Sequence, residues 1–180
     1  IYNVFKEIGI DDFTIKINNR KLLSGFFEML ELSNNSQDML KIIDKMSKIG
    51  IDNVKEELTV LNITSKKIDQ IINFINIKGS CEEIFKTLDK FNDGNTLYKE
   101  GLDELKQVIK YLRVFGVSDN YFKVDLATIR GLDYYTGTVY ETVLNKNEEL
   151  GSICGGGRYD DLAEYYTAKK LPGVGISIGV

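Results

Sequence analysis

The residues best suited to chemistry in this 180-residue chain gather in one stretch, residues 128–141, which reads TIRGLDYYTGTVYE. Arg130, Asp133 and the adjacent Tyr134 and Tyr135 stand close to two glycines there. A guanidinium presents a fixed fork of donors that suits a carboxylate or a phosphate. Tyrosine adds a flat apolar wall and a hydroxyl that bonds a polar ring or an amine. The stretch predicts recognition of a small, polar, anionic ligand, and an Arg–Asp pair that only ties the loop is the competing interpretation.

Two glycine-rich segments follow. Residues 155–160 read GGGRYD, and three glycines let the backbone approach a ligand or fold sharply before an expected helix with free amides. Taken alone, a tight turn is the simpler interpretation. Residues 173–179 read GVGISIG, which lacks the spacing of a dinucleotide-binding loop. The alternation predicts a strand with one packed face and one bare face, the latter open to a flat ligand, a backbone or a helix.

Much other chemistry is excluded. The chain has no histidine, so it has no Ser-His-Asp or Cys-His nucleophile system, no His-ligated zinc and no histidine general base. Residues 89–100 imitate a calcium loop, but Phe91 stands where an oxygen ligand is needed, so we prefer a helix end, a turn and a new helix. Cys81 lies in the first turn of an expected helix, where the dipole would lower the pKa of its thiol. Without a nearby partner we interpret that cysteine as incidental, and we predict no metal site.

The composition is that of a globular chain. Hydrophobic residues make up 43% and charged residues 28%, which is enough apolar material for a core. The net charge of −4 argues against a protein that coats nucleic acid. Cys81 and Cys154 form neither a metal-type pair nor a disulfide framework, which favours a reducing, intracellular setting. No membrane span or signal peptide is visible. Because the chain starts without Met and stops within an expected strand, we interpret it as a piece of a longer protein.

Helices are expected over most of the first two thirds. Apolar residues recur at helical spacing in four stretches: residues 39–46, 68–75, 84–91 and 102–115. Ser80 and Glu83 have the spacing of a capping box. Four glycines follow apolar helical runs, where a left-handed residue ends a helix: Gly9, Gly50, Gly79 and Gly116.

Strands are expected at residues 13–17 and through the last third of the chain. Asn18 and Asn19 follow the first strand and suit the cap of a helix over 21–32. The later extended segments are residues 121–126, 138–144, 150–154 and 173–180, with one helix around 159–169. Strands joined by short turns imply antiparallel pairing and an α+β fold. We expect a core part at 1–30, an all-helical block at 31–98 inserted into it, and a second core part at 99–180.

Three segments together resemble one known family. Residues 130–141 (RGLDYYTGTVYE) are similar to the histidine-specific signature of histidyl-tRNA synthetases, which are class II aminoacyl-tRNA synthetases. Residues 152–162 (SICGGGRYDDL) resemble their Gly-rich histidine-pocket segment, and residues 172–180 (PGVGISIGV) the leading strand of class II motif 3. Residues 14–21 (TIKINNRK) resemble the strand and helix after motif 2. The resemblance spans most of the chain in order, and the helical block falls where this family carries its insertion domain.

The resemblance implies part of the class II antiparallel sheet, flanked by helices and carrying an all-helical insertion. It implies that the full-length protein is a cytoplasmic homodimer that activates L-histidine with ATP, with Mg²⁺ as counter-ion, and transfers it to tRNA(His). No tightly bound cofactor is expected. The nucleophile is the carboxylate of the amino acid, which is already ionised at neutral pH. A site without histidine side chains can therefore catalyse the reaction by positioning and charge neutralisation.

The resemblance also implies residue roles. Arg130 is the expected catalytic arginine, near the substrate carboxylate and the α-phosphate. Tyr134 and Tyr135 line the histidine pocket, and Tyr159 closes it. The backbone lies close to the substrate or the adenylate at three glycines: Gly156, Gly157 and Gly175.

Several family features are absent from these 180 residues. Motifs 1 and 2 would precede the chain, and the motif 3 arginine and the anticodon-binding domain would follow it. We therefore expect the chain alone not to charge tRNA. The alternative is a paralogue without charging activity, such as the regulatory subunit of ATP phosphoribosyltransferase, and a plain small-ligand-binding α+β module is a third interpretation. Arg130 with Tyr134 and Tyr135 favours the enzyme, since a regulator does not need an arginine at the α-phosphate.

Overall fold

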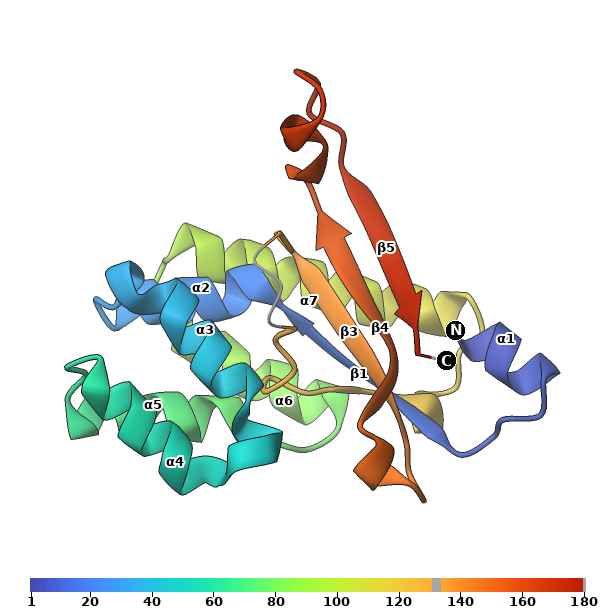
Figure 1. Ribbon diagram of the computed structural model, residues 1–180, viewed down its shortest axis with the longest axis horizontal. Helices are drawn as coiled ribbons and strands as arrows, with labels where there is room; N and C mark the ends of the chain where they lie inside the picture. The colour runs from blue at the N-terminus through green and yellow to red at the C-terminus, as the bar shows by residue number, and fades with distance from the viewer. Residues whose placement is uncertain (131–133, 180) are drawn as a thin grey trace.

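The computed structural model describes residues 1–130 and 134–179. In this part of the chain, strands form one five-stranded sheet in the order β2-β1-β3-β4-β5, with helices beside it (Figure 1). The strands are β1 (Phe13–Asn19), β2 (Phe122–Val124), β3 (Thr138–Leu144), β4 (Ser152–Tyr159) and β5 (Gly173–Ile178). The mixture of helices and a largely antiparallel sheet confirms the expected α+β fold.

One strand pair departs from the antiparallel expectation. β2 pairs with β1 in parallel, with Ile15 opposite Phe122. A parallel neighbour needs a long crossover, and the helical chain between the two strands supplies it. Antiparallel pairing was expected because short turns can join only antiparallel strands. The expectation is wrong for β1 and β2, which are joined by a long connection.

The helices follow the predicted periodicity closely. Their bounds are α1 (Tyr2–Glu7), α2 (Arg20–Met29), α3 (Ser36–Asp44), α4 (Met46–Val60), α5 (Ser65–Ile75), α6 (Cys81–Leu88) and α7 (Thr96–Val114). Gly50 (φ +81°) kinks α4 after its first turn. The Ser80–Glu83 capping box is present at α6, with the Glu83 amide donating to Ser80 Oγ and Glu83 Oε2 accepting from the Ser80 amide. Residues 89–100 form a 3₁₀ turn, a bend and the start of α7, as preferred over a calcium loop.

β1 and α2 follow each other directly, without an intervening loop. Phe13, Ile15 and Ile17 are buried and alternate with less buried residues, as a strand packed on one face requires. The side chain of Asn19 accepts a hydrogen bond from the Lys21 amide and caps α2. The helix ends at Met29, three residues before the expected end.

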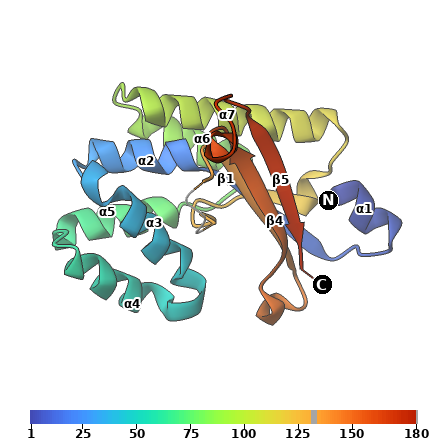
Figure 2. The ribbon, with the colours of Figure 1, turned by 45° about the horizontal axis from the view of Figure 1, so that its top comes forward.

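Helices α2 and α7 lie side by side (Figure 2) and approach closely at two glycines. A Cβ atom on Gly25 would stand 2.6 Å from Tyr98 Cα, and one on Gly101 would stand 2.7 Å from Leu22 Cα. These contacts are far inside normal van der Waals distance, so only glycine permits this crossing.

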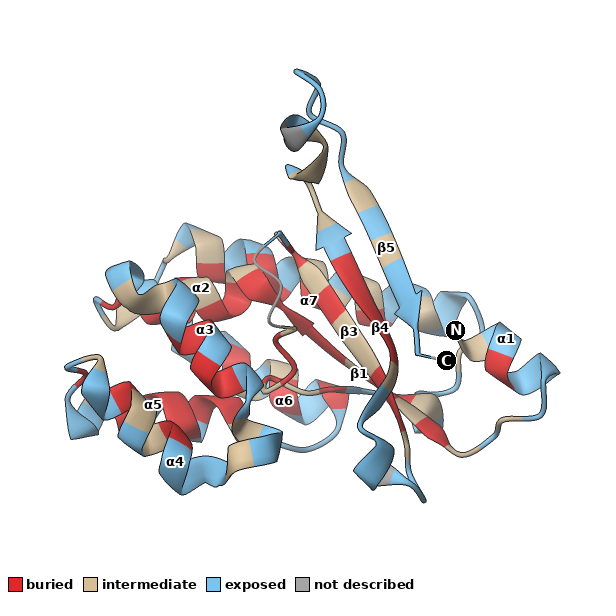
Figure 3. Ribbon diagram, viewed as in Figure 1, coloured by how far each residue is buried: buried red, intermediate tan, exposed pale blue. Residues whose placement is uncertain are grey.

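The core is continuous through the sheet and the helical block. Buried residues concentrate where α2 and α7 meet the sheet and along the facing sides of α3 and α5 (Figure 3). The ring of Phe26 on α2 stacks on that of Phe74 on α5, with centroids 3.9 Å apart. Cys81 is buried in this core, and burial raises the pKa of its thiol rather than lowering it. None of the helices in residues 1–130 and 134–179 combines the length and apolarity needed to cross a membrane.

Two expectations at β4 are wrong. Gly155, Gly156 and Gly157 lie within the strand rather than in a turn, because their backbones pair with both β3 and β5. The helix expected around 159–169 is replaced by the end of β4 and a short 3₁₀ turn at Leu162–Tyr165. Pairing of Tyr159 with Gly173 keeps the start of that segment extended, so ladder formation overrides its local helix preference.

Candidate active site

One face of the sheet carries the predicted chemistry. Side chains alternate between faces along a strand, and paired residues share a face. Glu141 is paired with Lys16 on one side and with Gly155 on the other. The Arg130 guanidinium lies over this group, because its Cζ atom is 2.9 Å from the point where a Cβ on Gly155 would stand. We call this side of the sheet the arginine face.

Arg130 is half-buried and held in an uncommon conformation. Its φ angle is +56°, in the left-handed region that disfavours residues with a side chain. Its Nε atom is buried and has no hydrogen-bond partner among residues 1–130 and 134–179. A buried donor without a partner is rare and calls for a ligand or a functional reason. Arg130 therefore presents unused donor capacity on the arginine face.

Glu141 sits beside this cation. Burial raises the pKa of its carboxyl, while the positive charges of Lys16 and Arg130 act against that rise. The Lys16 Nζ to Glu141 Oε1 distance is 3.8 Å. The two residues also line a cleft of about 520 Å³ between the sheet and helices α3, α4 and α5. The arginine face thus combines a cationic group with space beside it.

Three tyrosines stand together on the same face. The Tyr134 ring centroid is 4.6 Å from that of Tyr135 and 6.1 Å from that of Tyr159. Tyr135 is buried, and its Cδ1 atom lies 2.8 Å from where a Cβ on Gly157 would stand. Burial, followed by the hydrogen bond with Tyr134, raises the pKa of Tyr135 to about 12. Its phenol therefore remains a hydrogen-bond donor at neutral pH.

The glycines of β4 and β5 make room for these rings. The Tyr159 ring lies over β5, with its Cζ atom 2.7 Å from where a Cβ on Gly173 would stand and its Cε1 atom 3.2 Å from the same point on Gly175. The bare face expected for β5 is real, and an aromatic ring covers it. A side chain at either glycine would displace that ring.

Thr136, which directly follows Tyr134 and Tyr135, is tied to the end of β4 by polar contacts. The Thr136 hydroxyl donates to Asp160 Oδ2 at 2.7 Å, and the Thr136 amide donates to the Arg158 carbonyl at 2.9 Å. Arg158 Nε donates to Asp160 Oδ1 at 3.0 Å. The hydrogen bond from Thr136 lowers the pKa of Asp160. These contacts hold Thr136, which directly follows the two tyrosines, against the end of β4.

The structure brings most of the predicted residues together. The arginine face carries six of them: Arg130, Tyr134, Tyr135, Gly157, Tyr159 and Gly175. Gly156 is not with them, since a Cβ there would meet the Tyr140 hydroxyl at 2.8 Å and the Gly175 backbone. Gly131 and Asp133, also part of the predicted cluster, lie outside the described residues.

Two polar residues beside this site were not predicted. Asn18 is fully buried, and its Nδ2 atom donates to the carbonyls of Leu126 at 2.9 Å and Thr128 at 3.0 Å. Arg20 is 5% exposed, and its Nη1 atom donates to the Arg130 carbonyl at 3.1 Å. The sequence interpretation used Asn18 only as part of a helix cap. A run of polar residues directly after an apolar strand was the available signal.

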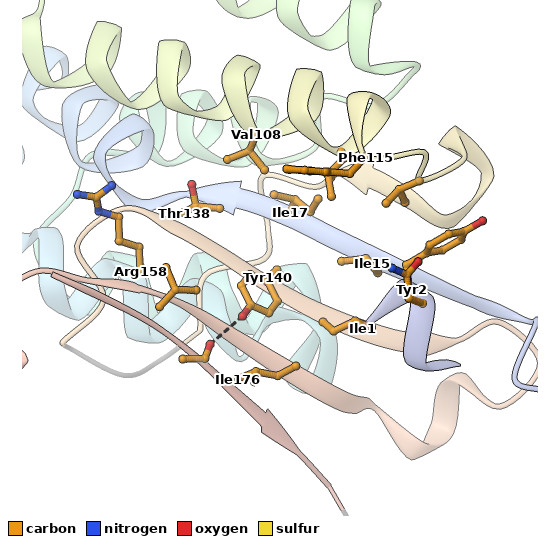
Figure 4. A pocket seen from close by; sticks show the side chains of 15 residues that line it. Ile1, Tyr2, Ile15, Ile17, Val108, Phe115, Thr138, Tyr140, Arg158 and Ile176 are labelled. Atoms are coloured by element: carbon orange, nitrogen blue, oxygen red, sulfur yellow. Dashed lines mark hydrogen bonds between the residues drawn. The ribbon is translucent and has the colours of Figure 1, made fainter. Parts of the chain in front are cut away.

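A second hollow lies on the opposite face of the sheet. This groove of about 620 Å³ is bordered by Val108 of α7, Phe115 just after that helix, Ile15 and Ile17 of β1, and Ile176 of β5 (Figure 4). The Tyr140 hydroxyl points across it and donates to the Gly175 carbonyl at 2.7 Å. Its lining is mainly apolar, with Arg158 as a charged residue among the lining side chains.

The apolar side of β5 faces this groove and corrects one expectation. Val174 is 69% exposed, and Ile176 and Ile178 are more than half exposed. A packed face was expected there. β5 is an edge strand of the sheet, and the described residues leave its apolar side uncovered.

The amino-acid sequence is similar to those of histidyl-tRNA synthetases. A protein-family model described as histidyl-tRNA synthetase matches residues 1–180. The histidine–tRNA ligase of Clostridium tetani (strain Massachusetts / E88) is 56% identical over 180 residues, which is all of this chain and 41% of that protein. The histidine–tRNA ligase of Finegoldia magna is 46% identical over 180 residues, or 42% of that protein. The chain thus spans about two fifths of the length of these relatives.

Solved structures with a similar fold include a histidyl-tRNA synthetase. A histidyl-tRNA synthetase from Nostoc sp. PCC 7120 superposes with a TM-score of 0.94 at 44% identity, covering 98% of this chain and 42% of that one. A structure described as an ATP phosphoribosyltransferase regulatory subunit/histidyl-tRNA synthetase from Bacillus halodurans C gives a TM-score of 0.77 at 19% identity, covering 98% of this chain and 44% of that one. The second likeness concerns the fold alone.

Proposed function

Because the chain belongs to the histidyl-tRNA synthetase family, we propose that it supplies the histidine-recognition side of the catalytic site of a histidine–tRNA ligase. The observation that carries this proposal is the grouping of Arg130 with three tyrosines on the arginine face. A cation with unused donors beside aromatic rings suits an amino acid whose carboxylate must meet a phosphate and whose side chain is a flat polar ring.

The proposed first reaction joins histidine to AMP. A carboxylate oxygen of histidine attacks the α-phosphorus of ATP, and the bond from that phosphorus to the α–β bridging oxygen breaks, so pyrophosphate leaves. No proton needs to be removed, because the carboxylate is already ionised. Arg130 donates hydrogen bonds to the carboxylate and the α-phosphate and stabilises the charge that develops between them. In the second reaction the histidyl group passes to tRNA(His) and AMP is released.

The tyrosines are assigned to the substrate side chain. Tyr135 is a protonated donor at neutral pH, so its hydroxyl can bond an imidazole nitrogen. Tyr134 and Tyr159 enclose the ring, and Gly157 and Gly175 permit the close aromatic packing around it. Gly156 is assigned only a part in close strand packing.

ATP is the second substrate, and Mg²⁺ accompanies it as counter-ion in this proposal. In the described part of the chain, no group of three or more Asp, Glu, Cys or His residues is placed to hold a metal ion. We therefore assign no residue of this chain to the ion and derive no step through it. No tightly bound cofactor is proposed.

The remaining proposals concern the division of the chain into domains, and the oligomeric state and location of the full-length protein. We propose that residues 31–98 are the insertion domain, between catalytic parts at 1–30 and 99–180. The helical content of α3 to α6 supports that division. We also propose a homodimer and a cytoplasmic location, which rest on the family resemblance and on two free cysteines.

Exchange of pyrophosphate into ATP tests the proposed function. The full-length protein that carries this segment is expected to exchange pyrophosphate into ATP when L-histidine is present. Other amino acids should give only background exchange, because the tyrosine group, formed by Tyr134, Tyr135 and Tyr159, selects the imidazole. Exchange that does not depend on histidine, or no exchange by a folded protein, would refute the proposal.

Tyr135→Phe is expected to raise the KM for histidine about 10-fold with a smaller change in kcat. The phenyl ring keeps its packing on Gly157. The variant removes the hydroxyl, and with it the hydrogen bond with Tyr134 and the hydrogen bond to the substrate, the latter worth roughly 1.5 kcal/mol. Tyr111→Phe is the matched control, since Tyr111 is an exposed tyrosine on α7. An unaltered histidine KM in Tyr135→Phe would place Tyr135 outside the pocket.

A further inference from the structure

The segment that leads to Arg130 is held along its backbone by the junction of β1 and α2. Asn18 binds the carbonyls of Leu126 and Thr128, and Arg20 binds the carbonyl of Arg130. These carbonyls belong to every second residue of the stretch 126–130. All three accept hydrogen bonds from two buried side chains, Asn18 and Arg20, which are separated by one residue. The junction therefore acts on the position of the stretch as a whole.

Burial of the Arg20 side chain costs free energy, because its charged guanidinium loses contact with water. A guanidinium taken out of water needs partners for its donors, and one partner here is a backbone carbonyl at the site. A second contact joins Arg20 Nη2 to Gln37 Oε1 at 3.4 Å. The start of α2 is itself fixed, because the Arg20 amide donates to the Gly137 carbonyl at 3.0 Å. Arg20 thus contacts the carbonyl of Arg130 through its side chain and the carbonyl of Gly137 through its amide.

The conformation of Arg130 needs such support. A left-handed φ angle in a residue with a side chain persists only where the surroundings impose it. The hydrogen bond from Arg20 acts on the carbonyl of this same residue. Rotation of the Arg130 backbone out of that conformation would break the bond and swing the guanidinium away from Gly155.

We propose that Arg20 is a positioning residue for Arg130: it holds the backbone of Arg130 in the left-handed conformation that aims the guanidinium over the arginine face. The inference rests on the proposed function, in which Arg130 stabilises the transition state of adenylate formation. Arg20 touches neither substrate in this scheme and acts through Arg130. Its loss is expected to affect the chemical step more than histidine binding.

A double-mutant cycle in the full-length protein separates this role from a general structural one. Arg20→Lys keeps the charge but lacks the planar fork, and it is expected to lower kcat for exchange about 10- to 100-fold, as displacement of a catalytic group does. The histidine KM should change less than about 3-fold. In an Arg130→Ala background the carbonyl of residue 130 remains, but the guanidinium is gone, so Arg20→Lys should then change kcat by less than about 3-fold.

The matched control is Arg113→Lys, the same change at an arginine that bonds Asp119 and Glu82 at the far end of α7. It should leave kcat and KM unaltered. Arg20→Gln serves as a second variant, and thermal unfolding of each protein reports whether it is folded. Equal losses of kcat with and without Arg130, a raised KM at constant kcat, no effect, or unfolding of both Arg20 variants would each overturn the positioning role. Absence of exchange in the unaltered protein would instead overturn the proposed function itself, and the inference with it.

Discussion

Arg130→Ala in the full-length protein is expected to slow histidine-dependent pyrophosphate exchange by about 100- to 1,000-fold, the loss seen when a preorganised donor to a developing charge is removed. Histidine binding should survive in part, because the tyrosine group is not altered. The expected pattern is therefore a large fall in kcat with a modest rise in the histidine KM.

The structure explains why this effect should exceed that of other charged residues nearby. The guanidinium of Arg130 lies over a strand position with no side chain, Gly155, and its buried Nε has no partner in the described part of the chain. Lys16 and Glu141, in contrast, lie 3.8 Å apart and partly neutralise each other. Arg130 thus has donors available for a ligand at low solvent exposure, where a charge-assisted hydrogen bond is strongest.

Two measurements on Arg130→Ala test this prediction. Steady-state exchange gives kcat and KM, and equilibrium binding of histidine without ATP gives the part that survives. Arg113→Ala is the control, since that arginine lies among exposed acidic partners away from the arginine face. Exchange at the original rate in Arg130→Ala would remove Arg130 from the mechanism.

Gly101→Ala is expected to lower the free energy of unfolding by about 3 kcal/mol or more, or to prevent folding altogether. In an ordinary helix the same change would stabilise by roughly 1 kcal/mol, because alanine has the higher helix propensity. Here the new methyl group would stand 2.7 Å from Leu22 Cα and closer still to its backbone nitrogen. Backbone atoms of α2 cannot rotate away as a side chain can, so the clash outweighs propensity.

Chemical denaturation of the full-length protein measures this effect. Lys99→Ala is the matched control, an exposed position in the same helix, where the change should stay within about 0.5 kcal/mol. Equal stability of the two variants would mean that α2 and α7 do not cross at Gly101 as described.

The elements that the sequence predicted well are those whose pattern is local. Alternation at Phe13, Ile15 and Ile17 and helical spacing in α5 and α7 each depend on which face of one element is buried. The Ser80–Glu83 capping box is likewise complete within four residues. Such features need no knowledge of the rest of the chain.

The failures occur where a distant strand decides the outcome. Gly155 to Gly157 have turn-forming composition, yet β3 and β5 pair with them on both sides. Nothing near residue 160 announces that Tyr159 will pair with Gly173. The parallel pairing of β1 with β2 depends in the same way on the whole helical crossover between them.

Residue types and spacing alone are enough to identify the chemical groups of the candidate site and their order: Arg130, the paired tyrosines and the glycine-rich segments. The tertiary structure decided which of them meet. Register across β3, β4 and β5 places Gly155 and Gly157 on the arginine face and turns Gly156 to the other. It also brought Arg20, 110 residues away in sequence, onto the Arg130 carbonyl. Side-chain chemistry is a property of each residue, whereas hydrogen bonds between distant backbones exist only once the chain has folded.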